Sequence, residues 1–158
     1  MSEIGKMRGR YFEEFEIGDT VVTAEHVVTA EEIMAFARLS GDDNPMHTDP
    51  EYTKTHMFGQ PVAHGLLILS IASGLAWQLG FMRHTALAFR DLEWKFSRPV
   101  FIGDRIRVKA EVIQRKAIRR LGGGAVIFEI KVLNQDDDVV QRGKWNVLVK
   151  SKVRRGES

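Results

Sequence analysis

The chain has 158 residues, a formal net charge of +2 with neutral histidines, and no cysteine. This length is typical of one domain with a substantial core. The absence of cysteine excludes a disulfide framework, a thiolate nucleophile and cysteine metal ligands. Basic residues alternate with acidic ones along the sequence, and no basic stripe is interleaved with stacking aromatics, so we do not expect nucleic-acid binding.

The sequence shows no export signal at its amino terminus and no membrane-spanning run. The first residues, MSEIGKMRGRYFEEF, lack the apolar core of a signal peptide, and we therefore expect a cytoplasmic location. The longest apolar run, at residues 64–79, is interrupted by Ser70, Ser73 and Gln78. Such a run is typical of a core helix rather than of a membrane span, and no membrane partner is expected.

The first predicted elements are a strand and a helix. Residues 21–28 form a short β-rich run. Thr29 and Glu32 then have capping-box spacing, ahead of apolar residues at helical intervals. This helix should end near Gly41, which would place Asp42 directly after a helix end.

The next segment, residues 42–47, brings together residue types that suit acid–base chemistry. A proline disfavours helix at Asn44, so the backbone must turn between Asp42 and His47. A turn can direct both side chains to one point. An aspartate and an imidazole that share a water molecule form an acid–base pair suited to neutral pH.

Residues 64–79 are apolar nearly all round and predict a helix buried on most faces. The first amides of a helix have no internal partner and favour negative charge. Gly65 lacks a Cβ, so a bound carbonyl could approach its N–H closely. Such a donor can form an oxyanion hole.

The second half of the chain alternates apolar and polar residues with a period of two, which predicts strands near residues 106–112, 126–132 and 145–149. The apolar parity changes between Phe89 and Leu92, which predicts a β-bulge near Arg90 and Asp91. Turns are expected at residues 122–124 and 134–138, and the last half-dozen residues are expected to form a loose tail.

Three stretches carry a family resemblance. The string SGDDNPMHTD at residues 40–49, then Phe58 and PVAHGL at residues 61–66, resembles the MaoC-like dehydratases, which include the (R)-specific enoyl-CoA hydratases. KFSRPVFIGD at residues 95–104 is also similar to that family. The similarity covers residues 12–150 approximately. It implies a single α+β domain over residues 1–158, with a hot-dog fold in which an antiparallel sheet wraps a long central helix.

The resemblance also implies site residues. Asp42 and His47 match the family's catalytic pair, and Gly65 matches the donor to the thioester carbonyl. The other candidate site residues are Asn44 and Ser73, as supporting positions, and His64, as a cap that holds Gly65 in place. Residues 53–56, TKTH, depart from the family pattern at the substrate entrance.

The implied activity is reversible hydration of trans-2-enoyl thioesters to (R)-3-hydroxyacyl thioesters, a hydro-lyase reaction of fatty acid metabolism. The resemblance implies no cofactor and no metal, with coenzyme A or acyl carrier protein as carrier of the acyl group. It further implies a homodimer, or a higher homo-oligomer, whose site is completed at the subunit interface.

Simpler interpretations remain for several of these residues. Asp42 and Asn44 are common turn formers, and a mid-helix serine such as Ser73 usually bonds to a carbonyl of its own preceding turn. A metal site at His47, Asp49, His56 and His64 matches no familiar ligand spacing. The alternative functions are a hot-dog acyl-CoA thioesterase and a non-catalytic acyl-binding or scaffold subunit.

Overall fold

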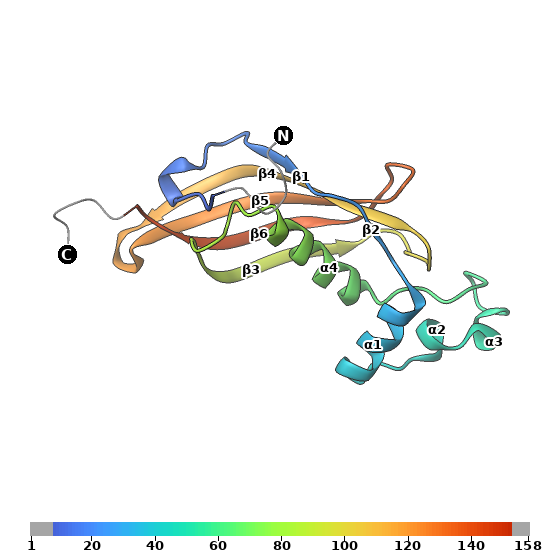
Figure 1. Cartoon of the computed structure of the whole chain (residues 1–158). Coiled ribbons are helices and arrows are strands. Elements are labelled where there is room, and N and C mark those ends of the chain that lie inside the picture. The colour runs from blue at the N-terminus through green and yellow to red at the C-terminus, as the bar shows by residue number, and fades with distance from the viewer. Residues whose placement is uncertain (1–7, 153–158) are drawn as a thin grey trace.

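A computed structural model describes residues 8–152 and shows an antiparallel sheet curled around one long helix (Figure 1). This is the predicted hot-dog architecture. The helix is α4, Gly65–Gln78, and the strand order is β1-β4-β5-β6-β3, with β2 also pairing with β4. The strands are β1 Thr20–Val22, β2 His26–Val27, β3 Ala86–Phe96, β4 Arg105–Ile118, β5 Gly123–Leu133 and β6 Val139–Lys150. The predicted loose tail lies outside the described residues.

The long strands form where the sequence alternates. In β4, Ile106, Val108, Ala110 and Val112 are buried, whereas Lys109 and Glu111 between them are exposed. The equivalent residues of β5 and β6 are also buried, and together they pack against Ile68, Ala72 and Leu75 of α4. The alternation confirms the predicted strands, because side chains of one parity face one side of a sheet.

Two local expectations were wrong. The predicted strand at residues 21–28 is divided into β1 and β2, which pair with separate stretches of β4. Of the three glycines expected to form a turn, only Gly122 has a left-handed backbone, with φ of 66°, and it follows the short 3₁₀ helix η2, Arg119–Leu121. Gly123 and Gly124 belong to β5, where an added Cβ would lie 2.1 Å and 2.4 Å from the nearest atoms of Val149 and Phe12.

Helix α4 occupies the predicted range but is not buried all round. His64 is its N-cap residue and Leu79 its C-cap residue. One stripe of the helix is exposed and includes Leu66 and Trp77, which are 59% and 47% exposed. The helix therefore packs on the sheet through one side. On the other side it leaves open a stripe that combines these two apolar residues with Ser70 and Ser73.

The exposed stripe of α4 lies beside β3, the strand at one edge of the sheet. The register of β3 with β6 shifts between Phe89 and Asp91, which confirms the predicted bulge. Almost all of β3 is exposed, including its large apolar residues. These are Leu87, Phe89, Leu92 and Phe96.

Short helices gather at one end of the sheet and lead into α4 (Figure 1). They are α1 Ala30–Ser40, α2 Pro45–Thr48 and α3 Pro50–Thr53, and the 3₁₀ helix η1, Phe12–Glu14, precedes them in the chain. The predicted capping box of α1 is present, since the side chains of Thr29 and Glu32 each accept from the other's backbone amide. Gly41 ends the helix with a left-handed φ of 82°. No helix among residues 8–152 combines the length and apolarity needed to cross a membrane.

We expect Thr29→Ala to destabilise the fold by about 1 kcal/mol, because it removes the acceptor that caps α1. Urea denaturation measures the change in the free energy of unfolding. Thr55→Ala is the matched control, since Thr55 lies exposed in a turn. Equal unfolding free energies for the two variants would show that the cap does not stabilise α1.

Candidate active site

Asp42 lies in the turn that follows α1, with its backbone held on both sides. Its amide donates to Oγ of Ser40 at 3.1 Å, and its carbonyl oxygen accepts from Nε2 of His64 at 2.8 Å. Its side-chain Oδ1 accepts from the amide of Asn44 at 3.4 Å. The turn is therefore fixed through its main chain while the carboxylate stays exposed.

His47 is carried by α2, which begins because Asn44 caps it and Pro45 occupies its first position. The Nδ1 atom of His47 lies 2.7 Å from the carbonyl oxygen of Val62, and the Val62 amide donates to the carbonyl of Met46 at 3.0 Å. A carbonyl only accepts, so Nδ1 carries a proton. In the neutral ring the lone pair is then on Nε2.

His64 is buried, at 2% exposure, between two aromatic neighbours. Its ring stacks on that of His47 with centroids 3.9 Å apart and an interplanar angle of 27°, and the Phe36 ring meets it edge-on at 4.9 Å. Because its Nε2 donates to the Asp42 carbonyl, His64 contacts both members of the predicted pair. The sequence predicts only that His64 holds the start of α4 in place. Its bond to Asp42 and its stack on His47 are contacts that the sequence does not indicate.

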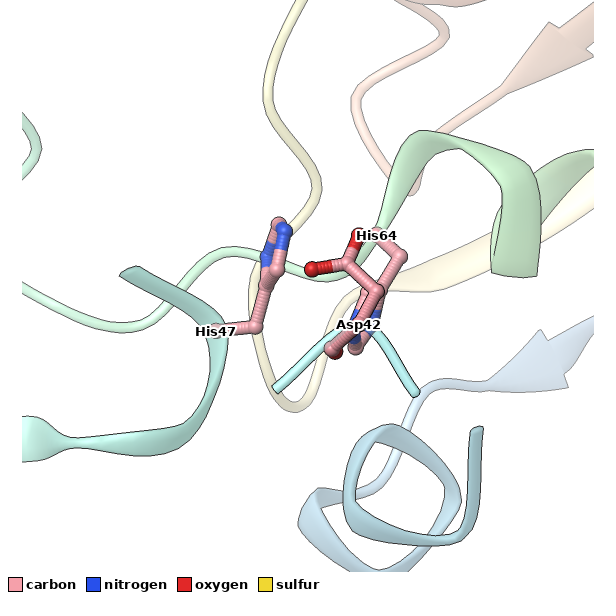
Figure 2. A group of neighbouring side chains, drawn as sticks. All are labelled: Asp42, His47 and His64. Carbon is pink, nitrogen blue, oxygen red and sulfur yellow. The ribbon is translucent and has the colours of Figure 1, made fainter. Parts of the chain in front are cut away.

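Asp42, His47 and His64 converge at one point (Figure 2). One nitrogen or carboxylate oxygen from each lies within 4.8 Å of the others, and Figure 2 shows the Asp42 carboxylate directed toward the His47 ring. Such a set could hold a water molecule or a cation. The rings of His47 and His64 are stacked, so their nitrogen lone pairs lie in nearly parallel planes and do not point to one centre. The geometry fits a shared water better than a metal ion.

The N-terminus of α4 lies next to this group. The first bond of the helix runs from the Ile68 amide to the His64 carbonyl at 3.2 Å, and the His64 side chain makes no capping bond. Within residues 8–152 the Gly65, Leu66 and Leu67 amides have no acceptor. They are the donors that a helix N-terminus offers to negative charge.

Gly65 is also in close contact with β3. A Cβ built on Gly65 would lie 2.6 Å from Cδ1 of Phe96. A side chain at this position would therefore have to displace the Phe96 ring.

A cavity of about 480 Å³ opens beside His47 and Gly65. Most of its lining is apolar. The apolar members are Met46, Phe58, Val62, Ala63, Leu66, Ile68, Phe96, Pro99 and Val100, and the polar ones are His47, Ser97, Arg98 and Gln141. Its size and lining suit a small organic ligand with an apolar part.

Two of the other sequence candidates have structural roles here. Asn44 caps α2, with its Oδ1 accepting from the Met46 amide at 3.1 Å. Ser73 lies further along α4, where its hydroxyl donates to the Ser70 carbonyl at 2.8 Å, and it lines a second cavity with Trp77. Ser73 is thus not among the side chains that converge on Asp42 in this chain.

The remaining metal-ligand candidates do not join the group either. Asp49 caps α3 by accepting from the Glu51 and Tyr52 amides. His56 lies between Tyr52 and Phe58, with ring centroids 6.1 Å and 5.8 Å away.

Sequence reasoning missed Gln141, which lines the cavity and is buried in β6. The sequence pattern could have identified Gln141. Gln141 has the same parity as Trp145, Val147 and Val149, so it is a polar residue on the inward side of an alternating strand. Its partners could not be read from that pattern.

Comparison with known proteins supports the resemblance. The sequence profile of the MaoC like domain matches residues 13–131. The chain is 40% identical to the (R)-specific enoyl-CoA hydratase of Aeromonas caviae over 83 residues, which are 52% of this chain and 60% of that protein. It is 29% identical to the 3-hydroxybutyryl-CoA dehydratase of Methylorubrum extorquens over 148 residues, 93% of this chain and 88% of that protein.

Solved structures agree. A protein of Archaeoglobus fulgidus, described as a monoamine oxidase regulatory protein, has a TM-score of 0.87 and 34% identity, and the match covers 95% of this chain and 100% of that one. The (R)-hydratase of Aeromonas caviae has a TM-score of 0.72 and 27% identity, with coverage of 89% and 99%. The matched profile spans most of the described chain and includes the converging residues. This chain therefore belongs to the MaoC-like domain family.

Proposed function

We propose that the protein catalyses the reversible hydration of trans-2-enoyl thioesters to (R)-3-hydroxyacyl thioesters. The observation that carries the proposal is the approach of the Asp42 carboxylate and the His47 ring beside the unpaired amides of α4. The (R) configuration is taken from the Aeromonas caviae relative. Hydration in this form is a hydro-lyase reaction, and it needs no cofactor.

The proposed mechanism uses one water molecule held between Asp42 and His47. Conjugation with the thioester makes C3 of the substrate electrophilic. As the water oxygen bonds to C3, one member of the pair takes a proton from it, and the pair delivers a proton to C2. The water thus contributes the hydroxyl at C3 and one hydrogen, and the pair returns to its starting state.

Attack at C3 moves negative charge onto the thioester oxygen as an enolate. The unpaired amide of Gly65 would donate to that oxygen. The partial positive charge at the N-terminus of α4 and the apolar walls of the cavity both favour this interaction, because a hydrogen bond to an anion is stronger where water is excluded. The same amide favours the enolate in the reverse direction, dehydration.

Thioester hydrolysis on the same fold is the second candidate, and a non-catalytic acyl-binding subunit is the third. Hydrolysis would direct the water to the carbonyl carbon instead of C3. The pair of Asp42 and His47 without an attacking side chain favours hydration, and the presence of both members argues against a degenerate site.

A panel of trans-2-enoyl thioesters from C4 to C16, on coenzyme A and on acyl carrier protein, tests the proposal and resolves the carrier. Loss of the enoyl-thioester absorbance without release of free thiol is the expected result. Release of thiol in proportion to substrate loss would identify a thioesterase. Binding without turnover of any member of the panel would identify an acyl-binding subunit.

We expect Asp42→Asn and His47→Gln each to lower kcat by about 10²–10⁴-fold, the usual contribution of general acid–base catalysis. Folding and substrate affinity should be largely retained. The backbone bonds of Asp42 do not involve its carboxylate, and the glutamine amide at position 47 can donate to the Val62 carbonyl in place of the ring Nδ1. Steady-state kinetics measures the effect. Asp43→Asn and His56→Gln are the matched controls, and near-normal turnover by either site variant would refute the assignment.

Gly65→Ala should fold and lose at least about 10-fold in kcat/KM. The new methyl must displace either the Phe96 ring or the start of α4, and a 1 Å misplacement in an active site can reduce a rate by about 10²-fold. Gly65→Val should have a larger effect. Two further variants, Phe96→Ala and Gly65→Ala/Phe96→Ala, distinguish displacement of the Phe96 ring from displacement of α4. Without the ring, the new methyl has room and α4 need not move. Parent-level kcat/KM in folded Gly65→Ala would place the oxyanion donor elsewhere.

The exposed apolar edge supports a homodimer. An edge strand with unpaired backbone groups and large apolar side chains favours pairing with a second copy, and a two-fold pair places the same surface on both sides. The occupant that we propose for β3 and the open stripe of α4 is therefore a second copy of this chain, which would complete the site.

Sedimentation velocity should accordingly show a dimer or a larger oligomer. Leu92→Lys on β3 should shift the protein toward monomer and lower its activity, because a lysine is difficult to bury in an apolar contact. Val22→Lys, on the opposite edge of the sheet, is the control and should do neither. A fully active monomer at assay concentration would contradict the dimer.

A further inference from the structure

Gln141 is a buried amide that links two strands to the start of α4. It is 2% exposed, and its Nε2 donates to the Gly65 carbonyl at 3.0 Å. Its Oε1 accepts from the indole Nε1 of Trp94 at 2.9 Å. Trp94 is on β3 and Gln141 on β6, so a short polar chain runs from the edge strand to the helix.

The chemistry of the two partners fixes the orientation of the amide. An indole nitrogen can only donate, and a backbone carbonyl can only accept. Rotating the Gln141 amide by half a turn would bring two donors together at Trp94 and two acceptors together at Gly65. Trp94 therefore sets which end of the Gln141 amide faces α4.

The carbonyl that Gln141 binds belongs to the peptide unit whose amide is that of Leu66. Gly65 and Leu66 supply the first two of the unpaired amides at this end of α4. A hydrogen bond to the carbonyl polarises its peptide unit and strengthens the N–H of the same unit as a donor. Gln141 thus acts on the helix end that faces the cavity.

The rest of α4 meets the sheet through apolar side chains such as Ile68, Ala72 and Leu75. Apolar contacts have little directional preference, whereas a hydrogen bond weakens steeply with angle. The contact of Phe96 with Gly65 limits how closely the helix start approaches β3. The bond from Gln141 fixes its rotation.

We propose that Gln141, held by Trp94, is a positioning residue that orients the Gly65 and Leu66 amides toward the substrate oxygen. The inference rests on the proposed function, which assigns the Gly65 amide to the thioester oxygen, and it adds the neighbouring Leu66 amide. Gln141 itself need not touch the substrate. It acts through the peptide unit between Gly65 and Leu66.

Gln141→Met tests the proposal, because methionine fills a similar volume without a strong donor or acceptor. We expect kcat to fall by about 10- to 100-fold, as for a displaced oxyanion donor, with KM within about twofold. Thr23→Val is the matched control: it removes another buried side-chain hydrogen bond, to the Val108 amide at 2.9 Å, beside β4. The control should lower the melting temperature and leave kcat unchanged.

Amide chemical shifts from NMR give a readout that does not depend on the substrate. In Gln141→Met the signals of Gly65 and Leu66 should move, and in Thr23→Val they should stay. If the parent protein turns over no enoyl thioester, the proposed function fails, and these shifts still decide the positioning role.

Unchanged signals together with unchanged kcat in Gln141→Met would overturn the inference. So would an equal loss of kcat in Thr23→Val, since that result would reflect general destabilisation.

If Gln141→Met does not fold, Trp94→Phe takes its place. It removes the indole donor and frees the Gln141 amide to rotate. Shifted Gly65 and Leu66 signals with a smaller loss of kcat support the role, and unshifted signals refute it.

Discussion

Two hydrogen bonds from imidazole rings to backbone carbonyls hold this site together. His47 bonds to the carbonyl of Val62, and His64 bonds to the carbonyl of Asp42. The first bond joins α2 to the segment that enters α4, and the second joins that segment to the turn after α1. The two rings stack between the two bonds. These bonds fix α4 relative to α2 and to the turn after α1. The distances from Asp42 and His47 to the amides of α4 therefore depend on both bonds.

The same two hydrogen bonds show which ring nitrogen of each histidine carries the proton. Since both carbonyls are acceptors, His47 presents Nε2 and His64 presents Nδ1 as the free nitrogen of a neutral ring. Buried Nδ1 of His64 has no partner within the described chain. Nε2 of His47 is the nitrogen that the proposed mechanism assigns to the water shared with Asp42. The proposed acid–base pair lies beside the unpaired amides of α4, and His47 and Gly65 line the same apolar cavity. This arrangement suits the proposed addition of water to a conjugated thioester.

The sequence predicts the parts of this structure that depend on local patterns. Period-two alternation predicts β4, β5 and β6, the capping box at Thr29 predicts α1, and the parity change near Arg90 predicts the bulge. The motif from Ser40 to Leu66 identifies the candidate pair through family resemblance. The stack of His47 on His64, the Phe96 ring over Gly65 and the bond from Gln141 to Gly65 join residues far apart in the chain. Such contacts depend on how the sheet closes around the helix, and no local pattern encodes that closure.

Hydration in H₂¹⁸O, followed by mass spectrometry of the products, tests the central claim most directly. The account predicts one ¹⁸O atom, at the C3 hydroxyl of an intact 3-hydroxyacyl thioester, with no label in the thioester carbonyl and no free thiol. Label in a released carboxylate, with an equal amount of free thiol, would contradict it and show that the water held by Asp42 and His47 attacks the carbonyl carbon.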